Sequence, residues 1–283
     1  MTEKFAIFIT THGRADNQIT LNTFKELGYT GDWYLVLDNT DDQIDAYIEN
    51  YGSEHIIVFD KFYFIEHTDV CQSVPQPKAV VFARNAVEFI APTLGYQYFM
   101  IVDDDVTNLR LRYPQDGSLK SARLTSCIDQ ILECVVQYMA STEIACATFG
   151  FTNTYRGGVA SVEKFTSRNR MCAELFIRNG AIPVNWRANF VEDLITSIDV
   201  GIRGDVCLQF IPIQLELCMN EGALPGGMSD AYNETGRFKF YSMPAIIYPN
   251  CVSVEFDGTK WRTRTQAEHS VPKIISSRYR KER

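Results

Sequence analysis

Three consecutive carboxylates, Asp103, Asp104 and Asp105, follow an apolar run from Phe99 to Val102 that predicts a buried strand. Carboxylates a few ångströms apart repel one another unless each faces bulk water, one takes up a proton, or a cation lies between them. The triplet therefore predicts either a solvated turn, where Asp is common, or a metal site. In such a site hard oxygen ligands hold Mg²⁺ or Mn²⁺ against the phosphates of a nucleotide.

A second acidic pair, Glu192 and Asp193, opens the helix predicted at 190–202. Acidic side chains in a first helical turn interact favourably with the helix dipole, so one interpretation is plain capping. The other is catalytic, because a carboxylate held at a helix start opposite a metal can take a proton from an acceptor hydroxyl. In that interpretation Asp193 is the general base, and Glu192 orients it or binds the acceptor.

Polar side chains also follow the first two predicted strands. They are Thr10, His12, Arg14 and Asp38. Such residues can bind the base and hydroxyl groups of a nucleotide. Alternatively, Asp38 starts a turn and Arg14 is merely solvated. The sequence contains no G-x-G-x-x-G after the first strand and no G-x-x-x-x-G-K-[ST], which argues against a dinucleotide-binding Rossmann protein and a P-loop NTPase. A metal on the Asp triplet is then the natural way to neutralise bound phosphates.

Short apolar runs alternate with helical patterns up to residue 149. The predicted strands are 5–10, 33–38, 55–59, 98–102 and 144–149, and the predicted helices are 18–27, 41–51, 79–91 and 124–140. This order predicts an α/β, Rossmann-like fold with a mixed, mainly parallel sheet flanked by helices, in which ligands collect at the carboxyl ends of the strands. No linker interrupts the chain. We therefore expect a single domain over 1–283, with a nucleotide-binding half at about 1–150 and an acceptor-binding half at about 151–283.

The composition is that of a globular protein, with 46% hydrophobic and 22% charged residues among 283. The net charge of −8 argues against attraction of nucleic acid by the overall field, but not against a local basic groove. The sequence shows neither a long apolar span nor the apolar region of a signal peptide, which predicts a cytoplasmic protein with no membrane partner. Eight scattered cysteines without a C-x-x-C pair are typical of reduced thiols.

The order of the acidic motifs resembles that of the GT-A glycosyltransferases. In that fold a strand ends in Asp-x-Asp, and a Glu-Asp pair opens a helix about ninety residues later, as here. The resemblance implies that Asp103 and Asp105 hold a divalent metal on a nucleotide-sugar diphosphate. It also implies that Asp193 is the base if the reaction inverts the sugar.

The stretch PKAVVFARNAV, residues 77–87, extends this resemblance. Arg84 and Asn85 match the Arg-Asn pair often found on the helix that lines the donor site, and Lys78 lies just before that helix. An ion pair in helix packing is the alternative role for this motif. The donor-binding residues implied in total are Thr10, His12, Arg14, Asp38, Lys78, Arg84, Asn85, Asp103 and Asp104.

The C-terminal third resembles a narrower group, the TET/JBP-associated glycosyltransferases. Gly226 and Gly227 match the glycine turn of that group, and SVPKI within 269–281 matches its Ala-Val-Pro-x-Ile stretch. The resemblance implies transfer of a sugar to the hydroxymethyl group of a modified pyrimidine in DNA, in the host cytoplasm if the protein is viral. The His pair expected ahead of SVPKI is absent, which leaves His269 as the candidate third metal ligand.

Basic residues could hold a DNA acceptor. They cluster at Arg110 and Arg112, at Arg168 and Arg170, at Lys260, Arg262 and Arg264, and in the tail at Arg278, Arg280, Lys281 and Arg283. Tyr155, Trp186 or Tyr232 could stack a flipped base. Each cluster is alternatively a solvated face, and the tail a disordered end.

The expected reaction is metal-dependent sugar transfer, with Mg²⁺ or Mn²⁺ as cofactor and a nucleotide-sugar, foremost a UDP-sugar, as donor. One alternative keeps the enzyme but changes the acceptor to a glycan, lipid or protein. Two others are a nucleotidyltransferase using two-metal chemistry and an inactive nucleotide-binding module. The combination of Asp103, Asp105 and Asp193 argues against the inactive module.

Overall fold

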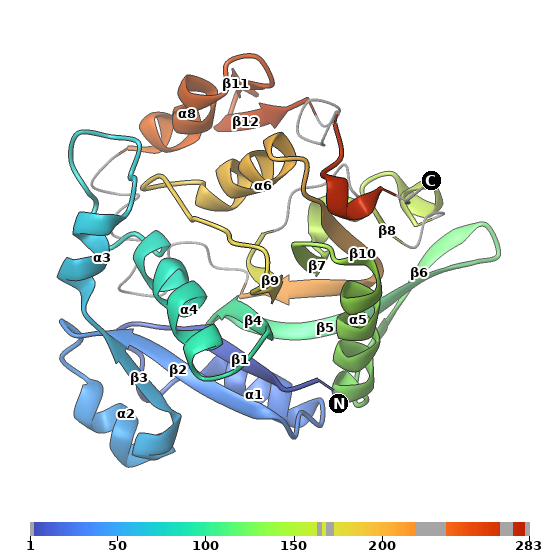
Figure 1. The fold of residues 1–283 in the computed structure, drawn as a ribbon. Coiled ribbons are helices and arrows are strands. Elements are labelled where there is room, and N and C mark those ends of the chain that lie inside the picture. Colours follow the sequence, from blue (N-terminus) through green and yellow to red (C-terminus); the bar gives the residue numbers. More distant parts are fainter. Residues whose placement is uncertain (1–2, 163–165, 168–172, 219–235, 267–273, 281–283) are drawn as a thin grey trace.

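The computed structural model describes residues 3–162, 166–167, 173–218, 236–266 and 274–280. One large mixed sheet forms the centre of the molecule, and a two-stranded hairpin lies apart from it (Figure 1). The sheet strands are β1 Phe5–Thr10, β2 Asp32–Asp38, β3 Ile56–Phe59, β4 Tyr98–Asp103, β5 Val106–Gln115, β6 Ser118–Arg123, β7 Cys146–Gly150, β8 Thr166–Ser167, β9 Leu175–Asn179 and β10 Cys207–Leu217. The hairpin strands are β11 Val252–Phe256 and β12 Trp261–Thr265.

Helices cover both faces of the sheet. They are α1 Ile19–Glu26, α2 Ile44–Tyr51, α3 Lys61–His67, α4 Val81–Thr93, α5 Ile128–Thr142, α6 Glu192–Ile202 and α8 Arg237–Ile247, with short 3₁₀ turns η1 Ser53–His55, η2 Thr152–Tyr155, η3 Gly158–Ser161 and η4 Ser277–Tyr279. No helix in the described ranges is long and apolar enough to cross a membrane.

The strand order across the sheet is β3-β2-β1-β4-β9-β7-β10-β5-β6. The first four strands are parallel, and in register Thr10 of β1 faces Asp103 of β4. In the other half β9 runs antiparallel to both β4 and β7, while β7 and β10 are parallel. The predicted α/β fold with its mixed sheet is confirmed, and the parallel half brings the ends of β1, β2 and β4 to one edge.

Side-chain alternation along β1 divides the core into two layers. Ile7 and Ile9 face the cluster that contains Phe24 of α1 and Leu132 of α5. Phe8 faces the opposite cluster, together with residues of α4 and the segment that precedes α6. A strand buried on both faces must be apolar at every position, which is why β1 reads FAIFIT without a polar face.

Helix α8 and the β11–β12 hairpin form a small unit at the top of the molecule in Figure 1. This unit packs on α6 through two apolar clusters. Met243 of α8 belongs to one cluster together with Ile195, and Cys251 beside β11 belongs to the other together with Ile198. The chain therefore attaches its C-terminal hairpin directly to the helix that Glu192 and Asp193 open.

The predicted helix at 124–140 begins later than expected. The N–H of Leu124 donates to Leu109 O at 2.9 Å, which continues the contact with β5. Cys127 then adopts a left-handed φ of 70°, and helix α5 starts only at Ile128. The apolar periodicity of 124–140 does correspond to a helix, but the left-handed Cys127 inside this window delays the start of that helix to Ile128.

Candidate active site

The carboxyl edge of β1 and β4 fixes the start of the Asp triplet. Thr10 Oγ1 donates to Asp103 Oδ1 at 3.2 Å across the parallel pair. Thr20 Oγ1 donates to the carbonyl of Asp103 at 2.7 Å and accepts from the N–H of Val106 at 2.9 Å. Neighbouring side chains therefore hold the turn between β4 and β5, so its carboxylates have defined directions.

Asp104 is committed to internal contacts. It is 6% exposed and forms an ion pair with Arg14. It also accepts from Thr11 Oγ1 at 2.6 Å. The pairing of Arg14 and Asp104 gives both predicted donor-binding residues a role in joining the loop after β1 to the end of β4.

Asp103 and Asp105 are better placed to receive a ligand. The Asp103 side chain is 24% exposed. Asp105 Oδ1 is buried without a hydrogen-bond partner among the described residues. Burial, followed by the charges of Asp103 and Asp104, raises the pKa of Asp105 to about 7. A cation would remove this cost, because Mg²⁺ commonly binds one or two carboxylates together with substrate phosphates.

Arg84 joins the triplet to the second acidic pair. From the interior of α4, at 2% exposure, its Nη2 donates to Asp103 Oδ2 at 3.1 Å, and its Nη1 pairs with Glu192. The aromatic rings of Phe176 and Trp186 lie against the guanidinium, with centroids 4.8 and 5.3 Å from its central carbon. One buried cation therefore ties β4 to the start of α6.

Asp193 follows Glu192 in the chain, and its carboxylate has fewer polar contacts than that of Asp103. Its Oδ1 accepts from the N–H of Leu194 at 2.6 Å, and its side chain is half-buried. Burial raises the pKa of Asp193, an effect that Arg84 opposes. Val191, just before it, adopts a left-handed φ of 54°, which a β-branched residue rarely tolerates. This strain at the start of α6 is the kind that clusters at functional sites.

Glu174 is a further acidic residue here that the sequence analysis missed. It immediately precedes β9, has a left-handed φ of 61°, and its carbonyl accepts from the N–H of Asp103 at 3.3 Å. Burial raises the pKa of Glu174 well above its usual value, and the charges of Asp103 and Asp193 add to the shift. A single Glu in CAELF carries no motif; only the antiparallel pairing of β9 with β4 brings it to the site.

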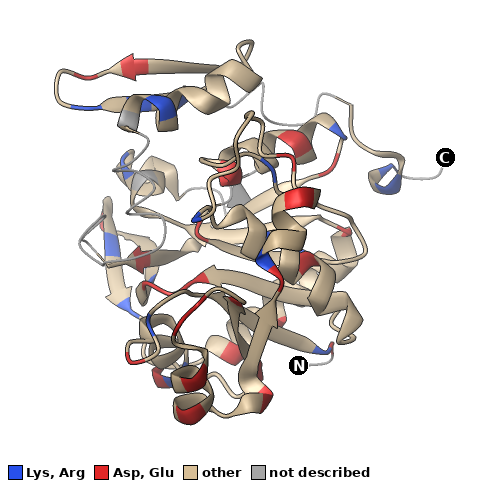
Figure 2. Cartoon of the chain, turned by 90° about the vertical axis from the view of Figure 1, so that its left-hand side faces the viewer, with Lys and Arg blue, Asp and Glu red and all other residues tan. Residues whose placement is uncertain are grey.

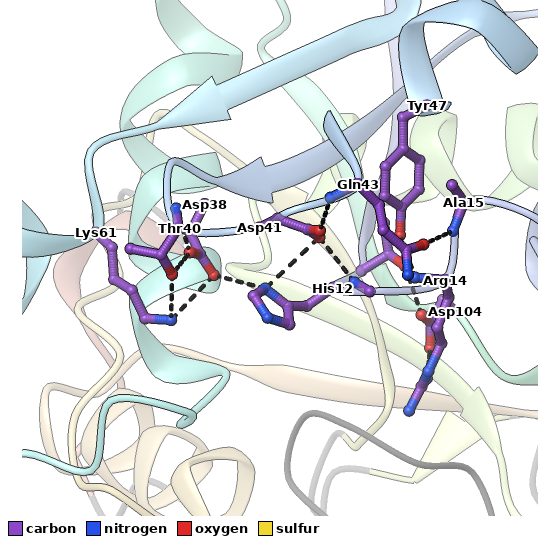
Figure 3. A network of polar contacts seen from close by, with 12 residues as sticks. His12, Arg14, Ala15, Asp38, Thr40, Asp41, Gln43, Tyr47, Lys61 and Asp104 are labelled. Carbon is purple, nitrogen blue, oxygen red and sulfur yellow. Dashed lines mark hydrogen bonds and ion pairs between the residues drawn. The ribbon is translucent and has the colours of Figure 1, made fainter. Parts of the chain in front are cut away.

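The end of β2 forms a second polar cluster beside the loop after β1 (Figure 3). Asp38 contacts His12 Nδ1 at 3.0 Å and Lys61 Nζ at 3.1 Å, and it accepts from the N–H of Thr40 at 2.9 Å. Burial opposes the charge of Asp38, but hydrogen bonds from His12 and Thr40 and the charge of Lys61 hold its pKa well below the usual range. The hydrogen bond to Asp38 raises the pKa of His12, although burial opposes this.

Backbone amides of the loop after β1 are held by side chains from α2 and from the segment leading into it, also drawn in Figure 3. Their donor–acceptor pairs are Gly13 N to Asp41 Oδ2 at 2.7 Å, Arg14 N to Tyr47 OH at 2.8 Å and Ala15 N to Gln43 Oε1 at 2.9 Å. Because these amides are satisfied internally, the loop presents side chains rather than a backbone cradle to a ligand. The sequence analysis identified neither Lys61 nor this second set of partners.

The other predicted donor-binding residues are Asn85 and Lys78. Asn85 bonds the segment before α6, through Trp186 O at 2.8 Å and the N–H of Trp186 at 2.9 Å. Lys78 is exposed just before α4. His269, Gly226, Gly227 and Tyr232 lie outside the described residues, as do Arg168 and Arg170.

The prediction that Trp186 or Tyr155 stacks a flipped base is wrong. Trp186 is 2% exposed and donates from Nε1 to Glu88 at 3.1 Å, inside the core. Tyr155 is 8% exposed, and its hydroxyl donates to the carbonyl of Ile211 at 2.7 Å. A flipped base cannot stack on either ring, because both are buried and the guanidinium groups of Arg84 and Arg112 lie over the rings of Trp186 and Tyr155.

Among the described residues, no three His, Cys, Asp or Glu side chains converge as a complete metal site. What the structure presents is a carboxylate pair, Asp103 and Asp105, at the carboxyl edge of a parallel half-sheet, with an acidic helix start across Arg84 and a charged cluster at the end of β2. Such an arrangement suits a group-transfer enzyme that acts on a nucleotide.

Residues 5–216 match the sequence profile of the TET-Associated Glycosyltransferase family. The match spans most of the chain, which therefore belongs to this family of glycosyltransferases and is an enzyme of that class. No curated protein matches the chain.

Solved structures with a similar fold share little sequence with it. Glucosyl-3-phosphoglycerate synthase from Mycobacterium tuberculosis in complex with Mg²⁺ and UDP is 10% identical, with a TM-score of 0.47 over 93% of this chain and 87% of that one. The same synthase with Mn²⁺, UDP and phosphoglyceric acid has a TM-score of 0.46 at 10% identity, over 97% and 88% of the two chains. A putative nucleotide-diphospho-sugar transferase from Desulfovibrio desulfuricans has 0.38 at 9% identity, over 74% and 80%.

Proposed function

We propose that this protein transfers a sugar from a nucleotide-sugar, foremost a UDP-sugar, to the hydroxymethyl group of a modified pyrimidine in DNA. The observation that carries the proposal is the unpartnered buried oxygen of Asp105 beside Asp103, across Arg84 from Glu192 and the neighbouring Asp193. Membership of the glycosyltransferase family supplies the reaction class. The acceptor follows the family resemblance, and the reaction would take place in the cytoplasm that holds this DNA.

Asp103 and Asp105 would hold Mg²⁺ or Mn²⁺ at the donor diphosphate, with His269 as the candidate third ligand. When bound, the metal neutralises charge that grows on the diphosphate as the sugar–phosphate bond breaks. The cluster of Asp38, His12 and Lys61 is suited to hold the nucleoside, because it offers a carboxylate acceptor, an ammonium donor and an imidazole within one network. Thr10 and Arg14 fix the loop that carries His12, and Lys78 stands at the entry to α4.

Asp193 would act as the base. Its carboxylate takes the proton of the acceptor hydroxyl, the resulting oxygen forms a bond to the anomeric carbon, and the nucleoside diphosphate leaves with the electrons of the broken bond. Glu192 is 6% exposed and paired with Arg84, so it would orient Asp193 rather than bind the acceptor. In this assignment about 1–150 binds the donor and about 151–283 receives the acceptor, within a single domain.

The decisive experiment is mass spectrometry of nucleosides from hydroxymethylcytosine and hydroxymethyluracil DNA incubated with the protein, Mn²⁺ and a panel of nucleotide-sugars. A pentose or hexose mass on one nucleoside, absent with Asp193→Asn, is the expected result. Asp116→Asn, in the exposed turn between β5 and β6, is the matched control and should transfer as the wild type does. Metal-dependent UDP release without addition to DNA would move the acceptor to a glycan, lipid or protein, and pyrophosphate release would indicate nucleotidyl transfer.

A further inference from the structure

The unit formed by α8, β11 and β12, residues 236–265, has a charge opposite to that of the whole chain. It contains five Lys or Arg against two Asp or Glu, whereas the chain carries a net charge of −8. Figure 2 shows Lys and Arg on both the helix and the hairpin of this unit at the top of the molecule. We call this surface the α8 hairpin face.

The acids of the unit do not cancel its cations. Asp257 pairs with Arg262, and Glu255 accepts from Arg264 at 2.7 Å. Lys239 and Lys260 form no ion pair with any described residue, and both are exposed. The α8 hairpin face therefore offers cationic side chains that an anionic partner could engage without first displacing an internal carboxylate.

Exposed aromatic rings lie among these cations. Phe238 is 52% exposed and Phe256 is 55% exposed. Both rings pack on Trp261, with ring centroids 4.8 and 5.1 Å away. Aromatic side chains interleaved with cations suit a polymer that carries both phosphates and flat bases.

The α8 hairpin face is rigidly joined to the candidate base. Tyr248, at the end of α8, donates from its hydroxyl to Asp199 of α6. Met243 belongs to the same apolar cluster as Ile195, two residues beyond Asp193, and this cluster connects the same two helices. A polymer bound to this face would therefore be positioned relative to the start of α6.

We propose that the α8 hairpin face binds the DNA acceptor, with phosphates on Lys239 and Lys260 and a base or base step against Phe238 and Phe256. This inference rests on the proposed function, and it adds where the nucleic acid is held. The basic cluster predicted at Lys260, Arg262 and Arg264 thereby becomes part of a defined surface. A membrane surface could share this chemistry, because Phe238 and Ile246 of α8 are both exposed, so binding to lipid vesicles is an outcome that the test must distinguish.

The test is fluorescence anisotropy of labelled hydroxymethyluracil DNA, single- and double-stranded, over a series of salt concentrations. Lys239→Gln with Lys260→Gln should weaken binding and reduce the log–log salt slope by about two, one for each lost phosphate contact. Phe238→Ala with Phe256→Ala should raise the Kd by about tenfold with the slope unchanged. Circular dichroism checks that each variant is folded, and the lysine pair keeps the test valid if the aromatic pair unfolds the hairpin.

The matched control combines Lys4→Gln with Phe89→Ala. Lys4 lies just before β1, and Phe89, which is 67% exposed, lies on α4. It should bind DNA as the wild type does, and UDP release without DNA should be unchanged in every variant. If both test variants bind DNA normally while the wild type glycosylates DNA, the α8 hairpin face is not the DNA-binding surface, but the proposed function stands. UDP release by a wild type that neither binds nor modifies DNA would overturn both. Loss of binding to phosphatidylserine vesicles alone would reassign the face to a membrane.

Discussion

Arg84 holds both carboxylate oxygens of Asp103 through one nitrogen, at 3.2 and 3.1 Å, while its other terminal nitrogen pairs with Glu192. The Glu192 contact is buried and the Asp103 contacts are partly buried, so the cation fixes the direction of Asp103. Burial raises the pKa of Glu192 to about 7, an effect that the charge of Arg84 opposes. The sequence analysis had assigned Arg84 to the nucleotide or, alternatively, to helix packing. The geometry supports a positioning role between the candidate metal ligand and the candidate base.

We expect Arg84→Lys to lower kcat at least tenfold, because a single ammonium cannot reproduce the two-sided contact of the guanidinium. Arg84→Gln leaves Glu192 buried without a partner and should cost about 3–5 kcal/mol of unfolding free energy. Urea unfolding and UDP release measure the two effects. Arg178→Lys is the control, since Arg178 is also buried but pairs with Glu88, at 2.6 Å, rather than with Asp103 or Glu192. It should lose stability with little change in kcat; equal kcat losses in both variants would make the role of Arg84 merely structural.

We expect Asp105 to contribute to metal binding and Asp104 to contribute to stability. Asp105→Asn removes a carboxylate that burial and its neighbours already disfavour, so stability should hold or rise while Mn²⁺ affinity falls at least tenfold. Asp104→Asn should do the opposite, costing about 2 kcal/mol through loss of the Arg14 pair but keeping Mn²⁺ binding. Electron paramagnetic resonance of Mn²⁺ and urea unfolding report on the two properties. A reversed pattern would assign the metal to Asp104.

Sequence patterns predicted those parts of the molecule that depend on local order. The strand that ends at Asp103 and the helix that begins at Glu192 follow from apolar runs and periodicity, which is why their positions were nearly correct. The β5–β6 hairpin was missed, although Asp116 and Gly117, with φ of 51° and 70°, form the Asp-Gly turn typical of hairpins.

Contacts made by the fold as a whole could not be predicted in this way. The approach of Arg84 to Glu192 and the burial of Trp186 depend on how β9 and α6 return to the sheet. Nothing in the spacing of the chain specifies these distances. The same limit hid Glu174, and it made Trp186 look available for stacking when the core encloses it.

Glu174 offers a test of stored strain. Glycine has no Cβ penalty at a φ of 61°, so Glu174→Gly should raise the unfolding free energy by about 1 kcal/mol, through relief of backbone strain and of repulsion from Asp103. We expect the same change to lower kcat. Asp116→Gly, at a φ of 51° in the exposed turn, is the matched control and should stabilise without affecting turnover. Unaltered kcat in Glu174→Gly would remove Glu174 from the active site.

The pair of His12 and Asp38 predicts a pH dependence of stability. The hydrogen bond to Asp38 raises the folded-state pKa of His12 above its usual 6.5, so its contribution is fully present below that value and is lost as pH rises through the folded pKa. The His12 side chain is 40% exposed, so solvent screening limits the effect to about 0.5 kcal/mol. Urea unfolding between pH 5.5 and 8.5 should show the wild type losing its advantage over His12→Asn in the upper part of this range.

His55→Asn is a control, because His55 stacks on Trp33 and bonds the carbonyl of Trp33 rather than a carboxylate. A difference between wild type and His12→Asn that stays constant with pH would show that the imidazole is not charged in the folded protein, and His12 would then act as a neutral hydrogen-bonding partner of Asp38.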